Sequence, residues 1–173
     1  MNCRAIVGLP VLAFTLALMP GEASGQQTSL KEQIVGAWTL VSAVDAAPDG
    51  SKTDTFGPNP KGAYMFDANG RFTQMLMRSD LPILESRTSG TPEQHKAVAH
   101  GAIAMYGTYT VDEATKTIIV NFEGSSFAKF NGTSGKRIVT SITADEMRTL
   151  NPATSTGTKA ESVWKRVKQP GTN

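Results

Sequence analysis

The chain has 173 residues, with 17 Lys and Arg against 15 Asp and Glu, a single cysteine and a hydrophobic content of 39%. That length suffices for one domain with its own hydrophobic core, and one cysteine excludes a miniature fold held together by disulfide bonds. A formal net charge of +2 gives no electrostatic reason to expect a nucleic-acid partner.

The first 25 residues are predicted to be a cleaved secretory signal. Arg4 supplies a positive charge, residues 5–19 form an apolar run, and residues 23–25 are the small residues that a signal peptidase prefers. A membrane-spanning helix is the alternative, but a run of about 15 residues is shorter than the ~20 that cross a bilayer. We therefore expect an exported protein, secreted or periplasmic, with no stable membrane anchor. Its domain would span residues 26–173 and would lack the only cysteine, Cys3.

The start of this domain is predicted to be a turn of helix followed by a strand. Ser29 and Glu32 have the spacing of a capping box, in which each side chain accepts a hydrogen bond from the other residue's backbone N–H. The helix would end near Gly36. Residues 37–45 mix β-branched and apolar residues, which is typical of a strand.

A hairpin and a loop come next. Residues 61–66 and 71–78 are predicted strands, and the connection at 67–70 contains Asn and Gly, which tolerate positive φ. Residues 79–90 contain a proline and show no apolar periodicity, so they are predicted to be a loop.

A second helix is predicted over residues 92–104. The Thr-Pro-Glu-Gln sequence at 91–94 places a capping Thr before a Pro in the first helical position. Val98, Ala102 and Met105 would form an apolar stripe along one face of this helix.

The remaining residues are predicted to be strands, which gives an all-β fold with eight strands in sequential antiparallel order. The eight predicted strands are 37–45, 61–66, 71–78, 106–111, 117–123, 135–143, 146–150 and 160–167. Eight strands in up-and-down order close into a small barrel without free edges. The long helix would then lie between the third and fourth strands. An open, cone-shaped sheet with a long helix is the alternative, although such folds usually begin with helices.

Several short motifs occur in one order along the chain. Gly36-Ala37-Trp38 begins the first strand, and Gly-Pro-Asn-Pro-Lys-Gly follows at 57–62, Asn-Gly-Arg-Phe at 69–72 and Tyr-Gly-Thr-Tyr-Thr-Val at 106–111. Together they resemble the lipocalin-like domain family of bacteria and fungi, over about residues 34–167. The resemblance implies a calycin-type barrel of eight strands with a helix between the third and fourth. Lipocalins in the wider sense bind small apolar molecules, and a minority of barrel relatives are isomerases or cyclases.

One end of such a barrel is expected to be closed by Gly36, Trp38 and Arg166. In the family the Trp of the Gly-x-Trp pattern plugs the closed end, and a cation stacks on its ring. Arg166, in the last predicted strand beside Trp164, is our candidate for that cation.

No catalytic residue, metal site or cofactor is predicted from the sequence. His95 and His100 are five residues apart on the predicted helix, about 140° around its axis, so they cannot share a metal ion. The Gly-x-Ser-x-Gly pattern of serine hydrolases and a glycine-rich phosphate loop are both absent from the sequence.

The predicted function is binding of a small, mostly apolar molecule inside the barrel. Side chains alternate between the two faces of a strand, so every second residue from Phe72 onward shares one face. Tyr106 and Phe122 would add aromatic surface. The loop 79–90 and the helix after it are the candidate lid over the open end. The predicted ligand-binding residues are Phe72, Gln74, Leu76, Arg78, Tyr106 and Phe122.

Two other functions remain open on the sequence alone. In an isomerase or cyclase, the barrel would orient an apolar substrate while an interior acid or base moves a proton, and Glu123 is the strand carboxylate nominated for that role. In a protein-interaction scaffold, the barrel would be solid and its outer surface would bind a partner. Arg78 and Arg137 are the cations to watch, because an Arg near the barrel mouth could pair with a ligand carboxylate, or instead with a Glu of the protein.

Overall fold

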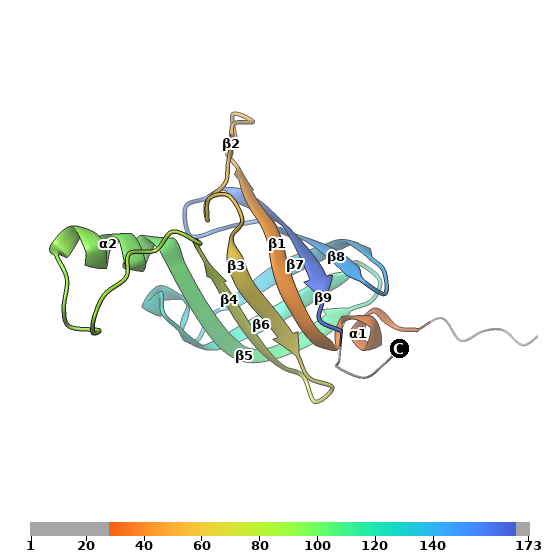
Figure 1. Ribbon diagram of the computed structural model, residues 1–173. Coiled ribbons are helices and arrows are strands. Elements are labelled where there is room, and N and C mark those ends of the chain that lie inside the picture. The colour runs from red at the N-terminus through yellow and green to blue at the C-terminus, as the bar shows by residue number, and fades with distance from the viewer. Residues whose placement is uncertain (1–27, 169–173) are drawn as a thin grey trace, which may run out of the picture.

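The computed structural model describes residues 28–168, so the predicted signal segment at 1–25 lies outside the described residues. Within them, nine strands form one antiparallel sheet in the order β2-β1-β3-β4-β5-β6-β7-β8-β9, and β1 also pairs with β9 (Figure 1). The strands are β1 (Gly36–Ala46), β2 (Lys52–Thr53), β3 (Lys61–Phe66), β4 (Arg71–Met77), β5 (Ala102–Asp112), β6 (Thr117–Ser125), β7 (Ser134–Ile142), β8 (Glu146–Asn151) and β9 (Lys159–Arg166). The helices are α1 (Leu30–Ile34), α2 (Pro92–Gly101) and the short 3-10 helix η1 (Ala128–Phe130).

Pairing of β1 with both β3 and β9 closes an eight-stranded up-and-down barrel, as the sequence predicted. The two-residue β2 pairs only with the end of β1 and does not enter the barrel wall. Because β2 adds a strand before β3, helix α2 lies between β4 and β5 rather than between the third and fourth strands of the chain. That detail of the prediction is corrected.

Helix α2 is shorter and more exposed than predicted. It ends at Gly101, and Ala102 already pairs with Met77 of β4. Pairing along β4 therefore overrides the helical pattern, so the predicted stripe of Val98, Ala102 and Met105 does not exist as a helix face. Only Gly101 of this helix is buried, and the helix with its preceding loop extends away from the barrel (Figure 1).

The strand register separates two ends of the barrel. The closed end contains helix α1 and the tight turns that join β3 to β4, β5 to β6 and β7 to β8. Glu113, in the turn between β5 and β6, accepts hydrogen bonds from the backbone N–H groups of Leu30 and Lys31 at 2.8 and 3.0 Å. The carboxylate thus attaches α1 to the barrel.

Longer connections gather at the open end. They are residues 47–60, which include β2, residues 78–101, which include α2, residues 126–133, which include η1, and residues 152–158. A small hollow is therefore expected on this side, since tight turns and α1 cover the other.

An aromatic column fills the barrel from η1 to the closed end. Neighbouring ring centroids along it lie 4.1 to 6.2 Å apart, and Phe130 stacks on Phe122 at its upper end. Trp164 packs beside it, 5.2 Å from Tyr64. The column consists of Phe130, Phe122, Phe72, Tyr64, Phe66 and Tyr109. Such tilted and edge-on contacts stabilise a core beyond the area they bury.

Candidate ligand-binding cavity

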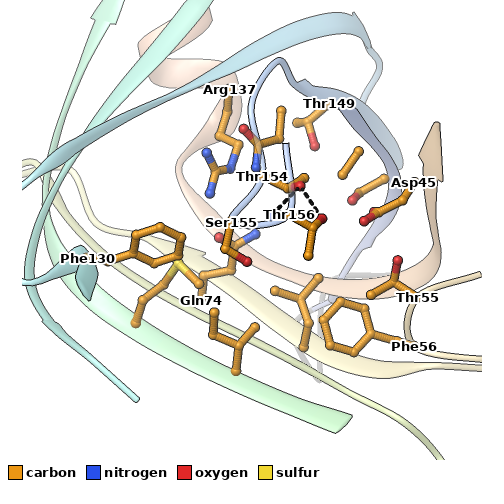
Figure 2. Close-up of a pocket in the computed structure, with 16 residues that line it drawn as sticks. Asp45, Thr55, Phe56, Gln74, Phe130, Arg137, Thr149, Thr154, Ser155 and Thr156 are labelled. Atoms are coloured by element: carbon orange, nitrogen blue, oxygen red, sulfur yellow. Dashed lines mark hydrogen bonds between the residues drawn. The ribbon is translucent and has the colours of Figure 1, made fainter. Parts of the chain in front are cut away.

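A cavity of about 140 Å³ lies at the open end of the barrel, with Phe130 of the aromatic column in its wall (Figure 2). Strands β1, β4, β5, β7, β8 and β9 supply its walls, and the connections after β2, β6 and β8 supply its rim. A larger hollow of about 570 Å³ lies outside the barrel at the closed end, between α1 and β7. It is mainly polar and includes Thr28, the first described residue, so we take the barrel cavity as the candidate site.

Apolar side chains form one side of this cavity. Leu76 of β4, Ile103 and Met105 of β5, Phe56 of the β2–β3 connection and Phe130 of η1 all line it. Phe130 is also the top of the aromatic column, so the packed interior of the barrel continues directly into the cavity wall. Small-molecule sites typically combine such an apolar surface with polar groups that orient the ligand.

Arg137 is the charged group that the structure places deepest in the cavity wall. It points inward from β7 and is only 8% exposed. Its Nη1 donates a hydrogen bond to the carbonyl oxygen of Lys136 at 2.9 Å, and no carboxylate within residues 28–168 forms a salt bridge with it. Burial lowers the pKa of Arg137 from its ordinary value, because desolvation disfavours the charged form.

Two further polar groups lie close to the same interior level. Gln74 is 4% exposed and lines the cavity, and its amide forms no side-chain hydrogen bond to any described residue. Tyr64, directly opposite Gln74 in the β3–β4 pairing, is fully buried, and its hydroxyl has no hydrogen-bond partner in the described chain. Burial raises the pKa of Tyr64 to about 12, although the nearby charge of Arg137 lowers it.

The rim on the far side of the cavity is a network of hydroxyl groups. Thr154 lies 2.9 Å from Thr156 and 2.6 Å from Thr158 between side-chain oxygens, and Thr158 donates a hydrogen bond to Asp45 at 3.0 Å. Asp45 lies across the cavity from Arg137 in Figure 2. Its carboxylate is therefore held by the rim and does not neutralise Arg137.

The structure brings together only part of the predicted ligand set. Gln74 and Leu76 line the cavity, while Phe72 and Phe122 lie below it within the aromatic column. Phe72, Gln74 and Leu76 do share the inner face of β4. The two aromatic rings support the site from beneath rather than forming its wall.

Arg78 and Tyr106 lie outside the cavity. Arg78 follows the end of β4, and its Nε and Nη2 donate to the carboxylate of Asp80 at 2.8 and 2.7 Å. Tyr106 is 49% exposed and covers Gly124 on the outer face of the barrel. The prediction for Arg78 extended the inner face of β4 past its last residue, and that for Tyr106 chose the wrong face of β5, where Met105 and Gly107 are the buried positions. The predicted places of Arg78 and Tyr106 in the cavity lining are therefore wrong.

Glu123 also lies on the outer face. Its two carboxylate oxygens accept hydrogen bonds from the guanidinium of Arg71 at 2.6 and 2.9 Å, and both side chains are about half exposed. The backbone register shifts beside it, between Tyr106 and Gly107 of β5. Glu123 thus supplies no acid or base to the cavity.

The closed end contains the three residues expected there. Trp38 is fully buried, and its indole N–H donates to the carbonyl oxygen of Ile34 at 2.8 Å. Arg166 lies over the Trp38 ring, with 4.0 Å between its Cζ atom and the ring centroid. Gly36 has a φ of +123°, and a Cβ there would lie 3.2 Å from Nη1 of Arg166.

Sequence reasoning missed the loop residues of the cavity. Phe56, Phe130 and residues 154–156 are far apart in the chain and meet only when the barrel closes. The predicted lid, residues 79–90 with the following helix, contributes no residue to the cavity lining. Three other connections, residues 47–60, 126–133 and 152–158, cover the opening instead.

Two further observations concern residues 28–168 only. No described helix is long and apolar enough to cross a membrane. No cluster of three or more His, Cys, Asp or Glu side chains in that range is arranged to hold a metal ion.

Comparisons with known proteins give the family. A lipocalin-like protein from Bacteroides uniformis has 12% sequence identity and a TM-score of 0.44, and the alignment covers 78% of this chain and 99% of that one. A second Bacteroides uniformis protein, solved by NMR, has 15% identity and a TM-score of 0.42, with 80% and 93% covered. No curated protein matches the chain. The model of the lipocalin-like domain matches residues 35–167. The chain therefore belongs to the lipocalin-like domain family.

Proposed function

We propose that this protein is an exported binding protein that holds a small, mostly apolar molecule in the open end of its barrel. The observation that carries the proposal is the cavity of about 140 Å³, which has an apolar wall on one side and polar groups on the other. Cavities of roughly 150 Å³ lined by aliphatic and aromatic side chains accept benzene, so this cavity has room for a ligand with one ring or a short branched chain.

The surroundings of the cavity support a preformed site. The aromatic column packs against it from below, and the rim is held by hydrogen bonds among Thr154, Thr156, Thr158 and Asp45. A ligand would therefore enter a pocket whose walls are already in place, and little binding energy would go into ordering them.

Binding can be tested with small neutral compounds such as toluene, benzyl alcohol and 1-hexanol, by saturation-transfer NMR. Ala160 lines the cavity, so Ala160→Phe should fill the site and abolish the signals. Ala104 is exposed, on the outer side of β5, so Ala104→Phe is the matched control and should bind as the parent protein does. Absence of binding by the parent protein, or equal binding by Ala160→Phe, would contradict the proposal.

Export is supported by the charged, apolar and small-residue order of residues 1–25. The test is expression of the full chain in a bacterium, followed by cell fractionation and sequencing of the N-terminus of the product. We expect a protein outside the cytoplasm that begins near Gln26. An uncleaved chain in the cytoplasm would contradict export and would leave the binding proposal to its own test.

A further inference from the structure

Among residues 28–168, Arg137 has no partner that explains its place inside the barrel. One N–H group reaches the neighbouring backbone carbonyl of Lys136, and its other N–H groups meet no acceptor among the described residues. Removing a charge from water is costly unless a counter-charge or several hydrogen bonds compensate. Within residues 28–168 the four carboxylates that form ion pairs are Asp80, Glu123, Asp145 and Glu146, and each pairs with a different cation.

The surroundings of Arg137 favour an external acceptor. Asp45, the carboxylate that lines the same cavity, accepts a hydrogen bond from Thr158 and lies on the far side (Figure 2). Within the described part of the chain, the Gln74 amide forms no side-chain hydrogen bond, and the Tyr64 hydroxyl is buried without a partner. A positive charge, an amide and a buried hydroxyl without a partner in residues 28–168 thus lie close to the apolar side of the cavity.

From this arrangement we propose that the cavity selects a small monocarboxylate, whose anionic group binds the guanidinium of Arg137 while its apolar body packs against Leu76, Ile103 and Phe130. The proposal rests on the proposed function and specifies the ligand class of the same site. A guanidinium matches a carboxylate because it offers two parallel N–H donors, and the charge-assisted bonds are strongest where water is excluded. The apolar wall and the cavity volume determine the rest of the ligand, which should be an aromatic or branched aliphatic group about the size of benzene.

Three probes of one size separate charge recognition from simple burial: benzoate, benzamide and benzylamine. Their affinities are measured by calorimetry with the purified protein at neutral pH. We expect benzoate to bind at least about tenfold more tightly than benzamide, because hydrogen bonds to charged groups exceed those between neutral ones. Benzylamine should bind more weakly than benzamide.

Arg137→Gln keeps a hydrogen-bonding side chain and removes the charge. The ratio of benzoate to benzamide affinity should fall to about one in this variant, with benzamide binding retained. Arg148→Gln is the matched control: Arg148 is half exposed and pairs with Glu146 near the closed end, so the ratio should stay as in the parent protein. Should Arg137→Gln fail to fold, Arg137→Lys keeps a cation but not the two parallel donors, and its ratio should fall severalfold.

The outcomes distinguish the two proposals. Equal affinities for benzoate and benzamide in the parent protein would overturn the carboxylate proposal and leave the binding function standing. A preference that is lost in Arg78→Gln but kept in Arg137→Gln would overturn the assignment to Arg137. No binding of benzoate, benzamide or the neutral compounds above would overturn the binding function, and the carboxylate proposal with it.

Discussion

Arg166 lies over the indole ring of Trp38, with its Cζ atom 4.0 Å from the ring centroid, and binds three backbone carbonyls at the same time. The acceptors are the carbonyl oxygens of Gln33, Val35 and Ala144. These carbonyls belong to α1, to the residue before β1 and to the turn between β7 and β8. One side chain therefore connects helix α1, the Trp38 plug of the closed end and the turn between β7 and β8.

Removing this side chain should destabilise the barrel. Arg166→Met keeps much of the length but loses the cation and the three hydrogen bonds, so we expect a loss of roughly 2–4 kcal/mol in the free energy of unfolding. Urea denaturation followed by Trp fluorescence measures it. Lys165→Met is the control, since Lys165 is the exposed neighbour on the same strand. A loss below about 0.5 kcal/mol for Arg166→Met would show that the contacts contribute little.

Gly107 should not tolerate a side chain. It lies at the register shift between β5 and β6, where a Cβ atom would overlap the carbonyl oxygen of Asn121 and come within 2.9 Å of the backbone nitrogen of Glu123. Because both obstacles are backbone atoms, Gly107→Ala should cost about 3 kcal/mol or prevent folding. Thr108→Ala, at the next position of the strand, should change stability by less than about 1 kcal/mol. Equal stability of the two variants would contradict this interpretation.

The buried Tyr64 hydroxyl should lower the free energy of unfolding at alkaline pH. Its pKa is raised from 10.0 to about 12 by burial. Below pH 10 the group is neutral in both states, and between about pH 10 and 12 it ionises only in the unfolded chain. The free energy of unfolding should therefore fall with rising pH in that window, by up to about 1.4 kcal/mol per pH unit.

Tyr64→Phe removes that contribution, so its unfolding free energy should fall less steeply between about pH 10 and 12, as measured by urea denaturation. The slope will not vanish, because burial also raises the pKa of Tyr109. At neutral pH this variant should be at least as stable as the parent, since the hydroxyl has no partner within the described chain. Tyr106→Phe, at an exposed tyrosine, is the matched control. Identical slopes for the parent and Tyr64→Phe would contradict the prediction.

The connection between β4 and β5, which contains α2, should not be needed for folding of the barrel. Arg78 donates its backbone N–H to the carbonyl of Gly101 at 2.8 Å, so a two-residue Asn-Gly turn in place of residues 79–100 would join β4 and β5 as a hairpin. We expect a change in unfolding free energy within about 1 kcal/mol, because this helix buries only Gly101. Ile83, at 95% exposed, would be removed with the segment.

The same shortened protein tests whether this segment acts as a lid. Its affinity for the small neutral compounds should match that of the parent protein, because none of residues 79–100 lines the cavity. A large loss of affinity with the barrel still folded would restore the lid hypothesis. Calorimetry alongside urea denaturation separates the two effects.

The barrel itself could be predicted because its signals are local. The turn at 67–70 contains the Asn and Gly that its backbone requires, and Gly70 has a φ of +88°. The alternation in β4 places Phe72, Gln74 and Leu76 on one face, and the structure buries all three. Closure followed from the strand number and order, which the sequence also contains.

The cavity could be predicted only in part, because its composition depends on contacts between distant segments. Residues 154–156 reach the cavity through the path of a loop, for which no periodic pattern exists. Arg137 alternates with Val139 on the inner face of β7, so its inward direction was accessible from the sequence. The sequence could not show whether a carboxylate of the protein lies next to Arg137, because that depends on the packing of the whole barrel interior.

The barrel combines a packed aromatic interior with a small cavity at its open end. Trp38, Tyr64 and Trp164 are fully buried in the packed interior, whereas Phe56 and residues 154–156 line the cavity from loops at the open end. Substitutions of these loop residues can change which ligand the cavity binds without disturbing the packing that specifies the fold. Such a barrel is a favourable starting point for both evolution and protein engineering, because its specificity can diverge while its architecture is retained.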